Sequence, residues 1–414
     1  MRPRALSRSA LFVAAVVFLA QVAGCGAPTE PGRLAEPTAT TSKTVRKIAV
    51  LAPLTGTQAV QGRGLLRAVE SAVDKRQAAL DQAGIELIVT PLDDRGEASV
   101  GQQQATRLTD DVAVVGLIGS VNSLVNESVQ PIVNNAGIAM VAPGGGATTL
   151  TTRGQPARRA FRTFFRLCAL DVNQGAATSQ WVSRGKATSV VLITDGQLEN
   201  RLVGRSLAQG LGKDVRLTTL TIARASQTPP TAAVLARIRQ AKPARIVFYG
   251  QPDDALPLRA SLKLPRVPFL TAGSIALDEA AQSDPVAWAG VQFSTVGAVP
   301  ASLPGFRPSV TPSPTPGSPE VSPSGLYAAA GTDAANLMIN QLLTDRVFTS
   351  TSATSVQRRQ AMVTAISKTN AVGLTGRIRF NTFGQVLQAP IGFGTFTRLD
   401  EPAWQPAIVV STQP

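Results

Sequence analysis

The sequence contains no histidine. Histidine is the commonest general base and a frequent zinc ligand, so its absence excludes Ser-His-Asp and Cys-His nucleophilic sites and most zinc sites. No Gly-rich phosphate loop and no paired-cysteine motif stands in their place. We therefore expect no cofactor, no metal and no catalysis, and a surface enzyme that works with carboxylates alone is the alternative.

Aromatic residues are scarce, at 5% of the chain, although the net charge is +14. Single-stranded nucleic-acid sites need aromatic side chains among the basic ones, and here the basic residues are scattered. We therefore expect no nucleic-acid partner. The positive charge suits anionic lipid headgroups, acidic wall polymers or an anionic solute.

Cysteine is also rare, since only Cys25 and Cys168 occur. If Cys25 is lipidated, as its surroundings indicate, no intramolecular disulfide is possible. Cys168 stands in the apolar run 164–170, and we expect it to be a small buried hydrophobic residue.

The N-terminus has the organisation of a bacterial lipoprotein signal peptide. A basic segment precedes the apolar stretch 10–20, which is too short to span a bilayer. The residues Val22-Ala23-Gly24-Cys25 then resemble a lipobox. We expect residues 1–24 to be removed and Cys25 to carry the acyl chains that anchor the protein outside the cytoplasm. An ordinary secretory signal with a chance cysteine is the alternative.

Two segments rich in proline, serine and threonine lack apolar periodicity. We expect residues 25–44 to form a flexible tether. The segment 300–324 carries eight prolines, and we expect it to be a disordered surface insertion.

Between these segments, short apolar runs alternate with stretches of helical periodicity. The first series predicts strands at 47–52, 85–90, 112–119 and 138–142 and helices at 65–80, 99–110 and 123–135. The second predicts strands at 189–195, 215–222, 245–250, 267–271 and 291–295 and helices at 198–211, 230–240 and 253–262. Such alternation is typical of parallel sheets covered on both faces. We expect two Rossmann-like α/β lobes with a ligand cleft at the carboxyl ends of their strands.

Four segments resemble, in order, the leucine/isoleucine/valine-binding family, the substrate-binding proteins of branched-chain amino acid ABC importers. They are Ile48 to Gly56, Ile118 to Gly144, Phe165 to Gly175 with Arg166, Asp171 and Gln174-Gly175, and Gly376 to Asn381 followed by Gly384. The likeness covers about 46–398, interrupted only by the proline-rich insertion.

The resemblance implies a type 1 periplasmic binding protein, in which three segments cross between the lobes. Lobe one would contain 45–168 and 325–373, and lobe two 169–299 and 374–410. The implied function is capture of a small polar solute, such as an amino acid, an amide or a carboxylate-bearing compound, for an ABC permease. We expect a monomer. A sensory or envelope lipoprotein that is not coupled to transport is the alternative.

The family's carboxylate-binding serine maps onto Ser123. The start of the helix 123–135 independently favours an anion, because its N–H groups are unpaired there. The alternative role of Ser123 is that of an N-cap. Gly144, Gly145 and Gly146 follow the next strand and expose backbone N–H and C=O groups to a ligand, unless they are merely a flexible turn.

The second lobe departs from the family. The acidic residue that pairs with the ligand's ammonium falls near Gly273, and the aromatic residue that covers the ligand falls near Pro252. The aromatic residue of the first-strand loop becomes Gln61. Burial of an ammonium without a carboxylate is unfavourable, so these differences place a plain α-amino acid ligand in question.

Two acidic residues are candidates to replace the missing carboxylate. Asp171, at the first lobe crossing, would approach the ligand from another direction, or else cap a helix that begins at Asn173. Glu199 follows the strand 189–195 and is the second candidate.

Overall fold

The computed structural model describes residues 43–56, 58–153, 158–223, 225, 228–273, 284–303, 325–397 and 403–412, without the side chains of Glu199, Pro252 and Pro285. The expected signal peptide, Cys25, the tether up to residue 42 and residues 304–324 of the insertion lie outside these ranges. Ser42–Pro414 forms one compact unit.

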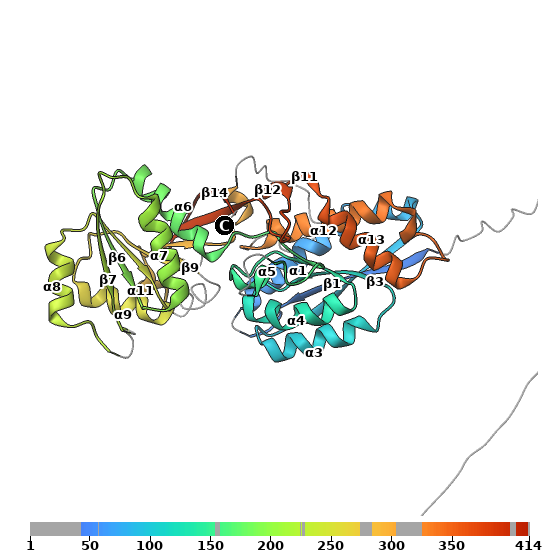
Figure 1. The fold of residues 1–414 in the computed structure, drawn as a ribbon, viewed down its shortest axis with the longest axis horizontal. Helices are drawn as coiled ribbons and strands as arrows, with labels where there is room; N and C mark the ends of the chain where they lie inside the picture. Colours follow the sequence, from blue (N-terminus) through green and yellow to red (C-terminus); the bar gives the residue numbers. More distant parts are fainter. Residues whose placement is uncertain are drawn as a thin grey trace, which may run out of the picture. The chain divides into compact units, whose positions relative to one another are not determined.

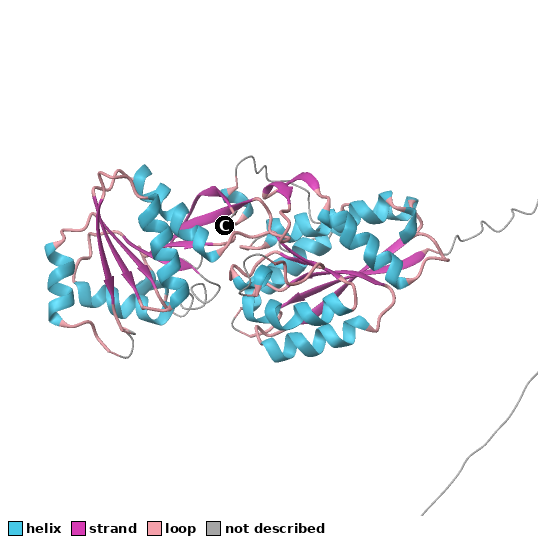
Figure 2. Cartoon of the chain, viewed as in Figure 1, coloured by secondary structure: helices cyan, strands magenta, loops and turns pink. Residues whose placement is uncertain are grey.

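The first sheet has five parallel strands in the order β2-β1-β3-β4-β5. Their bounds are β1 Thr44–Ala52, β2 Ile85–Asp93, β3 Val114–Gly119, β4 Ala139–Ala142 and β5 Phe164–Arg166. Side chains of a strand alternate between the two faces. Ile48 and Val50 join a core with α1 (Ala59–Asp74), whereas Ala49 and Leu51 join one with α3 (Ala98–Thr109) and α4 (Ser123–Asn135). Helices therefore cover both faces of this sheet (Figure 2).

Two helices from much later in the chain complete this unit, α12 (Ala328–Thr344) and α13 (Ser355–Ser367), shown in orange in Figure 1. Met338 of α12 packs on Gly116 of β3, where a Cβ atom would lie 2.6 Å from the Met338 sulfur. Arg359 of α13 donates hydrogen bonds to four backbone carbonyls, those of Thr109, Asp111, Val114 and Ala136. These carbonyls lie at the end of α3, just before and at the start of β3, and just after α4. Arg359 therefore ties α13 to the edge of the sheet at which its strands begin.

The second sheet has seven strands in the order β14-β13-β10-β9-β8-β6-β7. The parallel strands are β6 Ser189–Thr194, β7 Arg216–Thr221, β8 Arg245–Tyr249, β9 Phe269–Gly273 and β10 Gln292–Thr295, and the antiparallel ones are β13 Gln388–Thr395 and β14 Ala403–Ser411. Val190 and Leu192 share a core with α6 (Asp171–Arg184) and α7 (Leu198–Gly210). Val191 and Ile193 share the opposite core with α8 (Ala232–Gln240) and α9 (Pro252–Leu262).

Along the chain, a short two-stranded ribbon lies between α13 and the strand β13 of the second sheet. It consists of β11 (Asn370–Gly373) and β12 (Gly376–Arg379), which pair with each other. Buried Asp333 of α12 accepts hydrogen bonds from Leu374 N at 2.7 Å, Thr375 N at 2.8 Å and Thr375 Oγ1 at 2.7 Å. The ribbon is therefore tied to α12, whereas β13 and β14 join the second sheet.

Short elements complete the described ranges. They are α2 (Gln77–Gln82), α5 (Thr149–Thr152), α11 (Pro285–Trp288) and the 3-10 turns η1 (Pro300–Ser302) and η2 (Arg346–Phe348).

The two parallel-sheet units confirm the predicted fold class. The expected helix 65–80 was wrong in extent, because the structure has α1 from Ala59 and then α2. The first turns of α1, before Leu65, bury no large apolar side chain, for a physical reason. A Cβ atom on Gly62 would lie 2.0 Å from the Pro53 carbonyl oxygen, so the helix approaches the loop after β1 too closely for any residue but glycine.

Candidate functional site

Ser123 is the first residue of α4, directly beyond the carboxyl end of β3. The N-cap is Asn122, whose Oδ1 accepts hydrogen bonds from Leu124 N at 2.9 Å and Val125 N at 3.4 Å. The N-cap alternative for Ser123 was therefore wrong by one residue. Ser123 Oγ accepts a hydrogen bond from Ala147 N at 3.3 Å. Its own O–H remains able to donate to a ligand.

The glycine turn Gly144–Gly146 follows β4 and is buried. Each of its carbonyls accepts a hydrogen bond: Gly144 O from Asn126 Nδ2 at 3.2 Å, Gly145 O from Arg166 Nη1 at 3.0 Å, and Gly146 O from Asp171 N at 2.8 Å. Within the described ranges, the three amide N–H groups donate to no protein acceptor. The turn is thus held by its carbonyls, which opposes the flexible-turn interpretation and leaves its donors available.

A buried polar network holds the loops after β2, β3 and β4 together. Asn126 Oδ1 accepts a short hydrogen bond from Ser120 N, and Asn126 Nδ2 donates to Ser120 O at 3.0 Å. Ser120 Oγ in turn donates to Asp94 Oδ2 at 2.6 Å, and Gly96 N donates to Asp94 Oδ1 at 2.8 Å. Burial raises the pKa of Asp94. The sequence analysis did not identify this network, because its members lie in separate loops and in α4, and only the fold brings them together.

Arg166 lies fully buried beneath the glycine turn. Its Nη1 donates to Gly145 O and, at 2.6 Å, to Ala147 O, and its Nε donates to Gln385 Oε1. No carboxylate of the described ranges forms an ion pair with it, and its Nη2 has no hydrogen-bond partner there. Desolvation lowers the pKa of Arg166, and the nearby Cys168 and Asp171 oppose that shift. A buried cation that lacks a full counter-charge favours an anion in the turn above it.

Asp171 is the first residue of α6, so the helix begins two residues before Asn173. The capping alternative for Asp171 was wrong, because Leu170 holds the N-cap position and Asn173 Oδ1 accepts from Leu170 N at 2.9 Å. A Cβ atom built on Gly146 would lie 2.0 Å from Asp171 Oδ1. The carboxylate therefore lies directly against the glycine turn, and the structure brings Ser123, the turn and Asp171 together.

The remaining candidate residues lie away from the glycine turn or have side chains that the structure does not describe. Glu199 is the second residue of α7, after β6, and its side chain is not among the described ones. Pro252 begins α9, and its side chain is not among the described ones either, whereas Gly273 ends β9. Gln61 is buried in α1, and its Oε1 accepts from Leu326 N at 3.2 Å, so this side chain supports the segment before α12.

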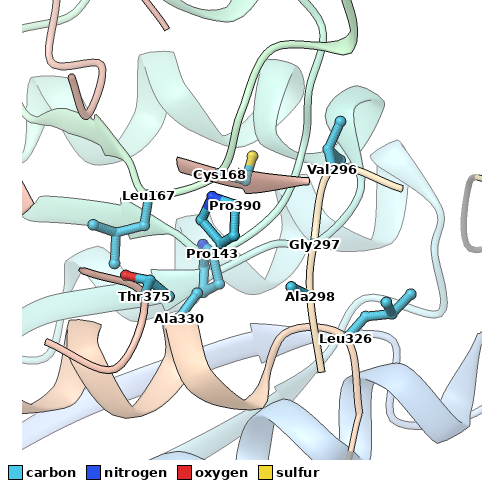
Figure 3. Close-up of a pocket in the computed structure, with 10 residues that line it drawn as sticks. All are labelled: Pro143, Leu167, Cys168, Val296, Gly297, Ala298, Leu326, Ala330, Thr375 and Pro390. Atoms are coloured by element: carbon cyan, nitrogen blue, oxygen red, sulfur yellow. The ribbon is translucent and has the colours of Figure 1, made fainter. Parts of the chain in front are cut away.

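A small cavity lies next to the glycine turn and is shown in Figure 3. Its volume is ≈ 10 Å³, which is room for about one water molecule and far too little for an amino acid. It is lined by Pro143, Leu167, Cys168, Val296, Gly297, Ala298, Leu326, Ala330, Thr375 and Pro390. Cys168 is buried, as expected, and burial raises the pKa of its thiol to about 12, so the thiol stays protonated at neutral pH.

Within the described ranges, no set of three acidic or cysteine side chains is placed to hold a metal ion. Nor does any helix of this part of the chain have the length and apolar character needed to cross a membrane.

The two α/β units and the donor-rich turn at the ends of β3 and β4 define an α/β solute-binding protein. Residues 46–296 match the model of the periplasmic binding protein family, and the chain belongs to this family. Membership implies a location outside the cytoplasm.

Curated relatives support the same family. The chain is 26% identical over 208 residues to the Leu/Ile/Val-binding protein homolog 3 of Brucella melitensis, which covers 49% of this chain and 53% of that protein. It is 31% identical over 136 residues to the Leu/Ile/Val-binding protein homolog 2 of Brucella abortus, which covers 33% of this chain and 35% of the relative. The chain thus spans about half, or less, of the length of these relatives.

Solved structures share the fold over nearly their whole length. A leucine-binding protein from Thermotoga maritima superposes with a TM-score of 0.61 at 20% identity, covering 88% of this chain and 99% of that one. A solute-binding protein of an ABC transporter from R. palustris, in complex with 4-hydroxybenzoate, superposes with a TM-score of 0.62 at 12% identity, covering 89% and 98%. The resemblance and the type 1 periplasmic-binding-protein fold are therefore confirmed.

Proposed function

We propose that this chain captures a small solute by its carboxylate group and delivers it to an ABC importer. One observation carries the proposal. The Ser123 hydroxyl, the N-terminus of α4 and the three amides of Gly144–Gly146, which have no acceptor within the described ranges, meet above the buried Arg166 guanidinium. Amide donors, a helix N-terminus and a nearby cation all stabilise a negative charge.

The class of solute follows from what surrounds this anion site. Leucine and 4-hydroxybenzoate, the ligands named for two similar proteins, both carry a carboxylate, but only leucine carries an ammonium. By the resemblance to the family, the position of the acidic partner of that ammonium falls near Gly273, which has no carboxylate. Asp171 lies close enough to Arg166 for their charges to interact, so its carboxylate is already partly compensated. We therefore favour a carboxylate without an ammonium, such as an aromatic acid.

The proposal includes the setting of the protein. Cys25 would carry the lipid anchor, and the protein would act as a monomer above the membrane. Lobe one would comprise 45–168 with 325–373 and lobe two 169–299 with 374–410, and solute binding would close the two about their crossing segments. Pairing of β13 and β14 with the second sheet supports the C-terminal assignment, although the ribbon bonded to Asp333 favours placing residues 374–379 with lobe one.

A thermal-shift screen with matched ligands tests the anion site. Benzoate and leucine would be compared with benzamide and leucinamide, which keep the shape but lose the negative charge. A ligand at 100 times its Kd adds about 2.7 kcal/mol to the free energy of unfolding, which raises Tm measurably. We expect one of the acids to raise Tm and its amide to have no effect. Equal shifts for an acid and its amide would contradict a site built for a carboxylate.

A further inference from the structure

The turns that lead into β6, β7, β8 and β9 carry a dense set of basic residues. These strands are parallel neighbours, so their amino ends share one edge of the second sheet. Asp214 is the one acidic residue of the turns, which span 184–188, 211–216, 237–245 and 263–268. The basic residues are Arg184, Lys186, Lys213, Arg216, Arg237, Arg239, Lys242, Arg245, Lys263 and Arg266, all exposed except Arg245, which is half-buried. We call this set the basic edge.

The first sheet shows that the architecture does not require such an excess. Its turns into β1, β2 and β3 carry both signs in equal numbers, Lys43, Lys75, Arg76 and Arg107 against Asp74, Asp81, Asp110 and Asp111. Two of these acids form ion pairs with lysines, Lys43–Asp81 at 2.7 Å and Lys47–Asp111 at 2.8 Å. The segment before β5 carries Arg153, Arg158, Arg159 and Arg162 without an acid, and Arg153 forms an ion pair with Glu127 of α4. Both sheets present helix C-termini to this edge, which attract cations equally. Helix dipoles therefore do not explain the basic edge.

Backbone conformation gives a second, independent observation. Lys186, Lys242 and Lys263, which follow α6, α8 and α9, have φ angles of 50°, 45° and 53°. This left-handed conformation at a helix end is usually taken by glycine, because a Cβ atom is strained there. After α2 and α4 the chain does use glycine, Gly84 and Gly137. The second sheet thus keeps a lysine at three helix ends where glycine would be more stable.

The side chains of these lysines have no ion-pair partner in the part of the chain that the structure describes, although the backbone of Lys186 and Lys242 forms hydrogen bonds. All three side chains are exposed. A strained lysine without an ion-pair partner is useful only if its charge meets something outside the protein. The pattern points to an extended anionic surface, because the charges spread across four adjacent strands rather than converge on one point.

We infer that the basic edge docks on the anionic phospholipid headgroups of the membrane. The proposed anchor makes this surface accessible, since the segment from Cys25 to Lys43 can span about 60 Å when extended. Attraction to an anionic membrane strengthens binding by about fivefold for each lysine or arginine near its surface. The inference concerns a face remote from the glycine turn, so it does not depend on which solute the protein binds.

Vesicle co-sedimentation tests this inference. The compact unit Ser42–Pro414 would be used, so that binding does not depend on the lipid anchor. Phosphatidylcholine vesicles with and without phosphatidylglycerol would be compared for two variants of equal charge. The test variant is Lys186→Gly/Lys242→Gly/Lys263→Gly, and the control is Arg63→Gln/Lys75→Gln/Lys368→Gln, which removes three exposed charges from α1, from the α1–α2 turn and from the end of α13.

We expect the unaltered protein to bind only the vesicles that contain phosphatidylglycerol, and to dissociate at high salt. The test variant should bind about 100-fold more weakly, at about fivefold per lysine. Its Tm should rise by a few degrees, because glycine relieves the strain at the three helix ends. The control should bind nearly as well as the unaltered protein.

Four results would overturn the inference. The first is no preference for phosphatidylglycerol. The second is an equal loss in the control, which would reduce the effect to net charge. The third is co-sedimentation with an acidic wall polymer and not with vesicles, which would assign the basic edge to the cell wall. The fourth is a lower Tm for the test variant, which would show instead that the lysines stabilise the fold.

Discussion

Replacing Ser123 by alanine should weaken solute binding and leave the fold nearly unchanged. The structure separates the two effects, because Asn122 and not Ser123 caps α4. The substitution removes the hydrogen bond from Ala147 N, which at 3.3 Å is long for an N–H···O bond, so we expect the free energy of unfolding to fall by less than about 1 kcal/mol. A hydrogen bond to a carboxylate contributes about 1.5–3 kcal/mol, which corresponds to a rise in Kd of about 10- to 150-fold.

Asn122→Ala is the matched control. It removes the cap from α4 and should lower the free energy of unfolding by about 1 kcal/mol, while the Ser123 hydroxyl stays in place. Calorimetry with the acid found in the ligand screen gives Kd for both variants, and thermal unfolding gives their stabilities. The reasoning fails if Ser123→Ala keeps the Kd of the unaltered protein, or if Asn122→Ala raises Kd as much as Ser123→Ala does.

Four further predictions address other parts of the chain. Asp171→Asn should weaken binding only of ligands that carry an ammonium, so calorimetry with an amino acid and with its deaminated analogue distinguishes the two classes; an equal loss for both would contradict this. Cys25→Ala should remove the protein from the detergent phase, because no thiol remains to accept a lipid, and unchanged partitioning would exclude an anchor there. Deleting residues 304–323 should shift Tm by only a few degrees, since loop closure changes by about 0.6 kcal/mol per doubling of length, and a collapse of cooperative unfolding would show that the segment packs. Burial raises the pKa of Asp94 above its ordinary value of 3.8, so its protonated form stabilises the fold at low pH and that contribution is lost as pH rises through the folded-state pKa. Asp94→Asn should therefore flatten the dependence of stability on pH in denaturant titrations across that range, and an unchanged slope would refute the assignment.

The parallel strands and most helices between them could be predicted because their apolar residues repeat with a clear period. β1 and α4 lie within a few residues of their expected bounds. α12 could not be found in this way. It is buried between α1, the first sheet and the ribbon, so apolar and small residues occur around its circumference and leave no single stripe. β5 has only three residues, too few for any periodicity.

For the candidate site, too, the sequence predicted the local features but not the contacts between distant segments. The resemblance to the family selected Ser123 and the glycine turn, and the rule that ligands bind at the carboxyl ends of strands agrees with both choices. The choice between Asn122 and Ser123 as N-cap depended on a boundary of one residue, and both types are good caps. The role of Arg166 depends on Gln385, 219 residues later, and such a contact is set by the tertiary fold.

The order in which the chain supplies segments to the two sheets also affects folding during export. α12 and α13, which close the first core, follow residue 327, and β14, which ends the second sheet, runs to Ser411. A chain that emerges from a secretion channel with its N-terminus first can therefore complete the first core only after Ser367 has crossed, and the second only after Ser411 has crossed. Contacts this distant in sequence also form slowly. The interleaved order of segments therefore delays folding during export, and it leaves the apolar faces of both sheets open to aggregation until the late segments arrive.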